Sequence, residues 1–230
     1  MKTKSLAAGI GVAMAVASAQ TVSAVVVALT NPGFETDDVP PNNGNPIVPS
    51  GWTQFAGGAG GSFVGDGNWV TIPGPHSGDQ FYLAYTDSGH RTLRQETSLM
   101  WSSLSAGDTL TVSAWTTYRS DLSANVQAYF WFNDSDGAGI YSGFDPSDAA
   151  AGVWTERTWT YAVTQTVLDA AVANSWGAVE LQVGVIGAPG ARQTVFDDIS
   201  LTYTAVPESS GITLCGAGLG LALLRRKRRV

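Results

Sequence analysis

The sequence contains a single cysteine, Cys215, and it lies in an apolar segment near the C-terminus. No intramolecular disulfide can form, so core packing or a bound metal must stabilise the folded part of the chain. Lysine is missing between residues 25 and 205, where five arginines stand against 18 carboxylates and leave a net charge of −13. A surface of this charge repels phosphate backbones, and we expect no nucleic-acid partner.

Catalytic signatures are also scarce. The only two histidines, His76 and His90, lie in turn-rich stretches, and there is no Gly-x-Ser-x-Gly elbow, His-Glu-x-x-His motif or phosphate loop. A glycosidase needs two carboxylates, and Glu96, Glu156 and Glu180 all fall on expected strands with polar neighbours. Charged residues on a solvated strand face are the commoner explanation, so we expect a protein that is not an enzyme.

What the sequence does contain is many short strand-like runs separated by Gly, Pro, Asn and Asp. The runs span residues 25–29, 69–72, 80–85, 92–99, 109–119, 125–133, 154–163, 179–186 and 195–203. Such spacing predicts an all-β, antiparallel β-sandwich. The one helical pattern, residues 167–173, predicts a short loop helix between Thr166 and Asn174.

The N-terminal 24 residues have the layout of a secretory signal peptide. Lys2 and Lys4 precede an apolar run, which ends in small residues. We expect a signal helix over residues 1–24 with cleavage after Ala24, and cleavage after Ala19 is the alternative.

Two neighbouring runs, 109–119 and 125–133, predict a polar and aromatic surface. In each run, apolar side chains alternate with polar or aromatic ones, and only residues 120–124 separate the runs. A connection of this length favours a hairpin, which would bring the second faces of both strands together. Aromatic planes bind the C–H faces of sugar rings, and amide and guanidinium groups bind the hydroxyls. The candidate carbohydrate-binding residues are Trp115, Arg119, Gln127, Tyr129 and Trp131.

Four motifs across the body resemble those of the galactose-binding-like jelly rolls found among carbohydrate-binding modules. They are Asn-Pro-Gly-Phe-Glu at 31–35, Pro-Ser-Gly-Trp at 49–52, Ser-Gly-Asp-Gln at 77–80 and Phe-Asp-Asp-Ile-Ser-Leu at 196–201. The resemblance implies an antiparallel jelly-roll β-sandwich over residues 25–205 and a structural Ca²⁺ held by Glu35 and Asp197. Alternation places Asp197 on the same, inward face as Ile199, Leu201 and Tyr203. A buried carboxylate needs a partner there, either the cation or backbone N–H groups.

The C-terminal 25 residues resemble a PEP-CTERM sorting signal. Val206-Pro207-Glu208 begins a short motif, in which Ser209 stands where that family usually has a second proline. An apolar segment, 211–224, follows, and then a basic cluster of Arg225, Arg226, Lys227, Arg228 and Arg229. The resemblance implies a transmembrane sorting helix that is read by an exosortase in the inner membrane, with the basic cluster in the cytoplasm.

These patterns together predict an exported, cell-surface or extracellular-matrix protein with a non-catalytic carbohydrate-binding-like domain. It would be held in the inner membrane as an intermediate and then transferred to the cell surface. Two alternatives stay open. The first is an exopolysaccharide-associated structural protein with no specific sugar site, and the second, less favoured, is a small glycosidase.

Overall fold

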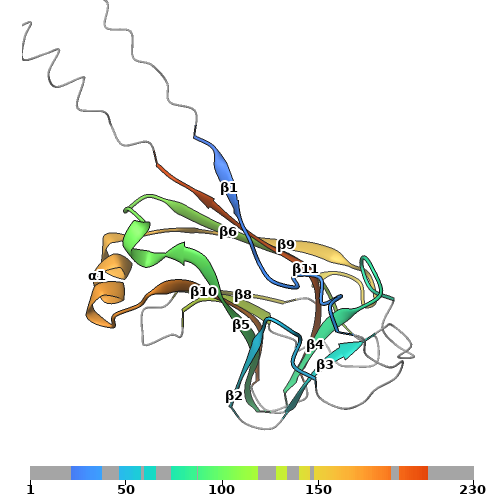
Figure 1. The fold of residues 1–230 in the computed structure, drawn as a ribbon. Coiled ribbons are helices and arrows are strands. Elements are labelled where there is room, and N and C mark those ends of the chain that lie inside the picture. Colours follow the sequence, from blue (N-terminus) through green and yellow to red (C-terminus); the bar gives the residue numbers. More distant parts are fainter. Residues whose placement is uncertain are drawn as a thin grey trace, which may run out of the picture. The chain divides into compact units, whose positions relative to one another are not determined.

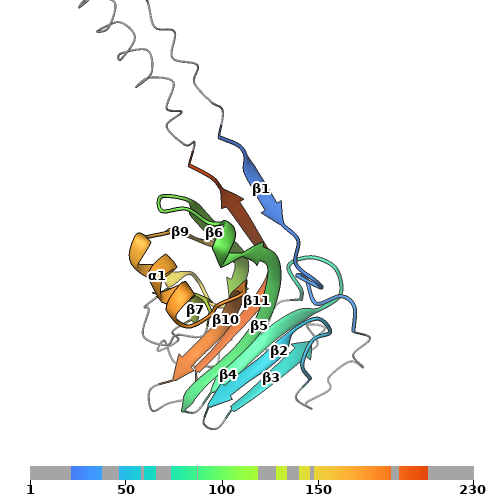
Figure 2. The ribbon, with the colours of Figure 1, turned by 60° about the vertical axis from the view of Figure 1, so that its left-hand side comes forward.

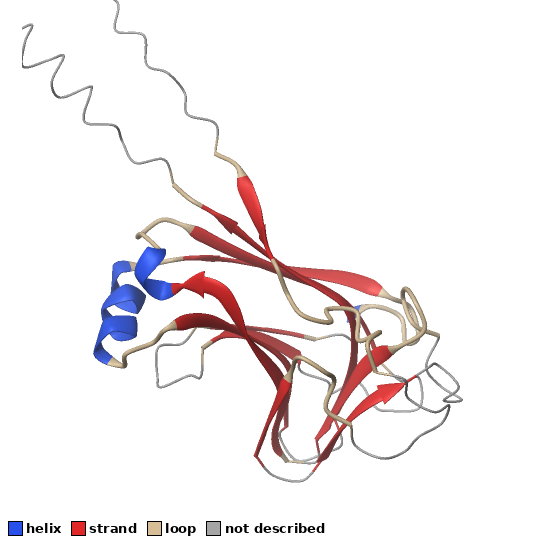
Figure 3. Ribbon diagram, in the orientation of Figure 1, coloured by secondary structure: helices blue, strands red, loops and turns tan. Residues whose placement is uncertain are grey.

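A computed structural model of the chain describes residues 22–37, 47–57, 60–65, 74–86, 88–118, 128–133, 140–145, 148–187 and 192–206. Strands dominate these ranges (Figure 3). Residues Ser23–Val206 form one compact unit.

Two antiparallel sheets make up this unit (Figure 1). Sheet A contains, in spatial order, β3 (Gly60–Gly65), β4 (Phe81–Thr86), β11 (Arg192–Thr204), β6 (Thr109–Thr117) and β9 (Thr155–Ala162). β1 (Ala24–Val27) also belongs to sheet A and pairs with the end of β11, as two views show (Figures 1 and 2). Sheet B contains β2 (Thr53–Gly57), β5 (Gly89–Met100), β10 (Ala178–Gly187), β7 (Ala128–Phe132) and β8 (Tyr141–Phe144).

Most consecutive strands alternate between the sheets, and the exceptions are the pairs β3–β4 and β7–β8, each of which lies within one sheet. β4 lies in sheet A, β5 in sheet B, β6 in sheet A and β7 in sheet B, and the last two strands, β10 and β11, again lie in different sheets. This winding is that of a jelly roll, which is one way for an antiparallel domain to limit its exposed edges. The expected antiparallel sandwich is therefore confirmed.

The core lies between the inner faces of the two sheets. On β6 the alternation predicted from the sequence holds, because Leu110, Val112 and Ala114 are fully buried while the residues between them are partly exposed. Phe130 of β7 and Val183 of β10 belong to the same buried cluster. Removing this apolar surface from water is the main stabilisation that the chain has in the absence of disulfides.

Two short helices close one end of the sandwich. η1 (Trp101–Ser103) follows β5 directly, and α1 (Gln165–Ala173) lies between β9 and β10. The Thr164 side chain accepts a hydrogen bond from the Val167 N–H and caps α1, so the predicted loop helix is confirmed with a start two residues earlier.

In the part of the chain that the structure describes, no helix has the length and apolarity needed to cross a membrane. The expected signal helix and the expected membrane segment 211–224 fall almost entirely outside the described residues.

Candidate functional site

The outer face of sheet B carries aromatic rings on two strands and polar groups on the strands beside them. Trp131 of β7 lies directly opposite Tyr141 of β8 and, on its other side, opposite Gln182 of β10. Gln182 in turn lies opposite Arg94 of β5. Since directly opposed residues project from the same face of a sheet, these side chains share one surface. Phe130 and the other alternate residues of β7 project into the core instead.

Three aromatic rings adjoin one another on this face. The ring of Tyr129 stacks on Trp131 with centroids 5.1 Å apart and an interplanar angle of 26°, and its centroid lies 6.1 Å from that of Tyr141. Tyr141 is 52% exposed, whereas Trp131 is only 7% exposed. Tyr141 is therefore the ring that is open to a ligand, and Trp131 supports the stack from below.

A polar network lies next to the aromatic stack. Glu180 accepts a hydrogen bond of 2.7 Å from the Gln182 side-chain amide, and its other oxygen lies 3.7 Å from Arg94 Nη1. The Arg94 guanidinium also lies over the ring of Phe55, 5.3 Å from its centroid. The face thus combines the exposed Tyr141 ring with a charged and amide network, in which contacts with Glu180 hold Arg94 and Gln182 in place.

Arg94, Gln182 and Tyr141 also belong to this surface and were not predicted from the sequence. Arg94 and Gln182 each lie in a strand in which polar residues alternate with buried ones, so alternation was a usable signal for both. Tyr141 lies in the short strand Tyr-Ser-Gly-Phe, which carries no comparable signal.

The predicted hairpin between residues 109–119 and 125–133 is wrong. β6 pairs with β9 and β11 in sheet A, and β7 pairs with β8 and β10 in sheet B. A short connection does not require a hairpin when a chain crosses from one sheet of a jelly roll to the other. Trp115 therefore belongs to a different sheet from Tyr129 and Trp131. Arg119 and Gln127 lie outside the described residues.

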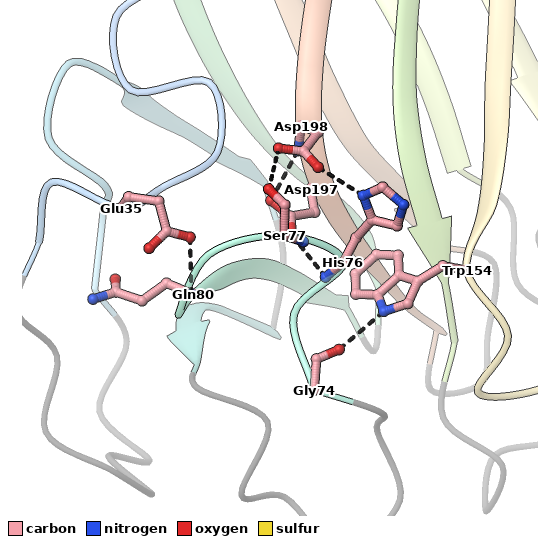
Figure 4. Close-up of polar contacts among 8 residues, drawn as sticks. All are labelled: Glu35, Gly74, His76, Ser77, Gln80, Trp154, Asp197 and Asp198. Carbon is pink, nitrogen blue, oxygen red and sulfur yellow. Dashed lines mark hydrogen bonds and ion pairs between the residues drawn. The ribbon is translucent and has the colours of Figure 1, made fainter.

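Trp115 instead takes part in a second cluster, on the outer face of sheet A. The His76 ring stacks on its indole with centroids 3.8 Å apart and an interplanar angle of 12°. The Trp154 ring meets His76 edge-on at 5.9 Å, and its indole N–H donates to the Gly74 carbonyl (Figure 4). These contacts fix the segment 74–80 against the sheet and engage Trp115 in packing.

Asp197 also lies on this outer face, which corrects its predicted inward orientation. Asp197 is directly opposite Trp115, but the register between β11 and β6 then shifts before Ser200 meets Ser113. The shift is a β-bulge in which Asp198 has a φ of 47°, a left-handed conformation that Asp tolerates better than most residues. Because the bulge adds a residue, Ile199 and Leu201 face the core and Asp197 does not.

Asp197 is fully buried although it faces outward, because the segment 74–80 covers it. One carboxylate oxygen accepts the backbone N–H groups of His76 and Ser77, at 2.9 and 3.2 Å, and the other accepts the Asp198 N–H (Figure 4). Burial raises the pKa of Asp197 to about 7, against the lowering effect of these N–H groups. Asp198 contacts both the His76 ring and the Ser77 hydroxyl, each at 2.7 Å.

Glu35, the other predicted calcium ligand, lies next to the same segment. It accepts the backbone N–H groups of Asp79 and Gln80, both at 2.9 Å. A Cβ added at Gly33 would lie 3.8 Å from Asp197 Oδ1, 3.4 Å from Asp198 Oδ1 and 3.8 Å from Glu35 Cγ, so three acidic side chains approach this glycine. The described residues nevertheless contain no group of three His, Cys, Asp or Glu suited to hold a metal. Calcium binding stays a prediction.

The three glutamates considered for catalysis are divided between the sheets. Glu96 and Glu180 are directly opposed on the outer face of sheet B, next to the aromatic stack. Glu156 lies in β9 of sheet A, opposite Trp115. Only Glu96 and Glu180 are thus neighbours.

The predicted sorting motif begins at the edge of the described chain. Val206 is half-exposed, and its backbone N–H donates to Asp108 at 2.8 Å. Pro207, Glu208 and the basic cluster 225–229 lie outside the described residues.

Comparison with known proteins identifies the fold. The sequence matches no protein-family model and no curated protein. The Stig cyclase Fisc from Fischerella sp. TAU, solved with a pyrrolidinylidene-indole, is 14% identical, with a TM-score of 0.59 over 80% of this chain and all of that one. A second cyclase from the same organism gives a TM-score of 0.57 at 13% identity, over 80% of this chain and all of that one.

A carbohydrate-binding module is also among the similar structures. TmCBM61, solved in complex with β-1,4-galactotriose, gives a TM-score of 0.45 at 21% identity and covers 76% of this chain and 97% of its own. At these identities the likenesses with TM-scores above 0.5 show the fold alone, an antiparallel sandwich of two sheets. The ligand must be argued from the residues of this chain.

Proposed function

We propose that this domain binds a polysaccharide without cleaving it, through the outer face of sheet B. The observation that carries the proposal is the half-exposed Tyr141 ring, which adjoins the Tyr129–Trp131 stack and the Arg94–Glu180–Gln182 network.

The chemistry of this face suits a sugar. A pyranose ring has an apolar C–H face that packs on an aromatic plane, and its hydroxyls need donors and acceptors at the ring edge. Arg94 supplies donors and Glu180 supplies acceptors, whereas Gln182, which is only 4% exposed, holds Glu180 in place through its hydrogen bond. Because these groups hold one another in place, little conformational entropy is lost when they bind hydroxyls.

We also propose that the protein is exported and sorted to the cell surface. The basic and apolar N-terminus supports a signal peptide, and the motif, apolar segment and basic cluster after residue 205 support exosortase sorting from the inner membrane. Mass spectrometry of the protein from its native envelope tests this, because processing at both ends predicts a mature chain that lacks the N-terminal signal and the basic cluster.

A glycan array tests the binding proposal. Retention of a defined set of glycans supports a specific sugar site, whereas no retention on any glycan favours the structural surface protein. The directly opposed Glu96 and Glu180 are the one observation that favours a glycosidase. Release of reducing sugar that is lost in Glu180→Gln would establish that activity and overturn the non-catalytic proposal.

A further inference from the structure

We propose that a pocket at one end of the sandwich binds a small, neutral aromatic molecule of about two fused rings. The pocket lies between η1 and α1, at the end where α1 is drawn in Figure 1, and it has a volume of about 320 Å³. Trp101 and Trp176 line it together with Leu104 and Ala171. It is separate from the aromatic face of sheet B, with which it shares no lining residue among those described.

The two tryptophans form rigid walls. Trp101 is 2% exposed, its indole N–H donates to the Asn133 side chain at 2.6 Å, and its backbone N–H donates to the Gly177 carbonyl. Trp176 lies beside it with ring centroids 5.5 Å apart and an interplanar angle of 49°. Side chains that are already ordered lose little entropy when a ligand packs against them.

The position of Ser175 is a second observation that points to this pocket. The Ser175 N–H donates to the Val172 carbonyl and the Trp176 N–H to the Ala171 carbonyl, which is the Schellman pattern at the C-terminus of a helix. The residue at the Ser175 position of this pattern is usually glycine, because it is left-handed, and Ser175 has a φ of 56°. The chain carries a strained serine there, and this residue lines the pocket.

The lining defines the class of ligand. None of the described residues around the pocket is charged, and the hydroxyl groups of Ser102 and Ser175 are its only polar side chains apart from the indoles. A cavity of about 150 Å³ holds benzene, so a pocket twice that size accommodates about two rings. A sugar ring of the same size carries about five oxygens, and the mostly apolar lining offers few partners to those that face it.

Titration calorimetry with 2-naphthol tests the proposal. This probe has two fused rings and one hydroxyl, and it is neutral at pH 7. The intact chain should bind it with one site per chain, and Trp176→Ala should weaken binding at least tenfold through loss of one wall. Methyl β-galactopyranoside, a sugar of one ring, should not bind at this pocket.

Ser175→Gly separates binding from folding. The substitution relieves the left-handed strain, so the Tm should stay level or rise by about 1–3 °C. It also removes one hydroxyl of the pocket, so the affinity for 2-naphthol should fall about fivefold. A loss of binding in a chain that is no less stable cannot result from misfolding.

Tyr141→Ala, on the outer face of sheet B, is the matched control and should leave 2-naphthol binding unchanged. The proposal is overturned if 2-naphthol does not bind at 1 mM, or if binding is equal in the intact chain, Ser175→Gly and Trp176→Ala. It is also overturned if the galactoside binds in its place.

Discussion

The ring of Tyr129 lies against Gly143, the residue directly opposite it on β8. A Cβ at position 143 would lie 2.6 Å from Tyr129 Cε1, which is closer than any real Cβ contact. The missing side chain therefore lets the tyrosine ring extend across β8 toward Tyr141 and complete the three-ring surface of sheet B.

We expect Gly143→Ala to weaken polysaccharide binding. The added methyl group displaces the Tyr129 ring and breaks its alignment with Tyr141, which should lower the affinity by about five- to tenfold. Affinity electrophoresis in gels that contain the polysaccharide measures the effect. Gly74→Ala is the matched control, because a Cβ at position 74 meets no atom within 4 Å. Equal retention of the two variants would contradict this role of Gly143.

Asp197 should make the stability depend on pH. Its pKa is about 7 in the folded chain and ordinarily 3.8, so the folded state holds this proton more tightly than the unfolded state. The contribution of Asp197 to the free energy of unfolding is therefore largest at low pH and is lost as the pH rises from about 4 to about 7. In calcium-free buffer, the Tm of Asp197→Asn minus the Tm of the native chain should be larger at pH 8 than at pH 5. A difference in Tm that is the same at both pH values would show that the pKa is not raised.

Asp108 should be important for stability at the end of the domain. This residue is 2% exposed and accepts hydrogen bonds from the N–H groups of Ser105 and Val206 and from the Tyr203 hydroxyl, at 2.8–2.9 Å. Asp108→Ala leaves these donors without their acceptor and should cost about 3 kcal/mol of unfolding free energy. Tyr203→Phe, which removes one of the bonds, should cost about 1 kcal/mol. Urea unfolding measures both, and equal costs would show that Asp108 acts only through Tyr203.

Calcium should raise the Tm if Glu35 and Asp197 hold it. A cation that binds only the folded chain stabilises it by about 2.7 kcal/mol at a concentration a hundred times its Kd, which corresponds to about 5–10 °C here. Thermal unfolding in 1 mM CaCl₂ and in EDTA should differ by this amount, and the difference should vanish in Glu35→Gln. The same Tm in both buffers would show that the carboxylates serve only as acceptors for the segment 76–80.

The sequence predicts the elements that carry strong periodicity and misses those built around glycine. The alternation of Leu110, Val112 and Ala114 predicts both the strand and its buried face, and most of the other long strands were likewise expected. β2, β3 and β8 were not expected, because each is short and contains glycine, which weakens the strand signal.

Two features of the candidate site depend on tertiary structure that local patterns do not encode. The crossover of the chain between sheets separates Trp115 from Trp131, although a short connection favours a hairpin. The bulge at Asp198 reverses the faces of β11, so simple alternation places Asp197 on the wrong side. The hairpin rule holds for consecutive strands of one sheet, but here the chain crosses to the other sheet. The alternation rule holds for a regular strand, but here a β-bulge adds a residue.

Affinity electrophoresis of Tyr141→Ala beside Trp115→Ala tests the proposed binding face most directly. The two aromatic residues lie in different sheets, Tyr141 half-exposed on sheet B and Trp115 packed against His76 on sheet A. If the domain binds through sheet B, Tyr141→Ala should lose about tenfold in affinity for the polysaccharide in the gel. Folded Trp115→Ala should be slowed by that polysaccharide as much as the native chain is. The proposed binding face would be contradicted if Tyr141→Ala were retained as strongly as the native chain and Trp115→Ala were no longer retained.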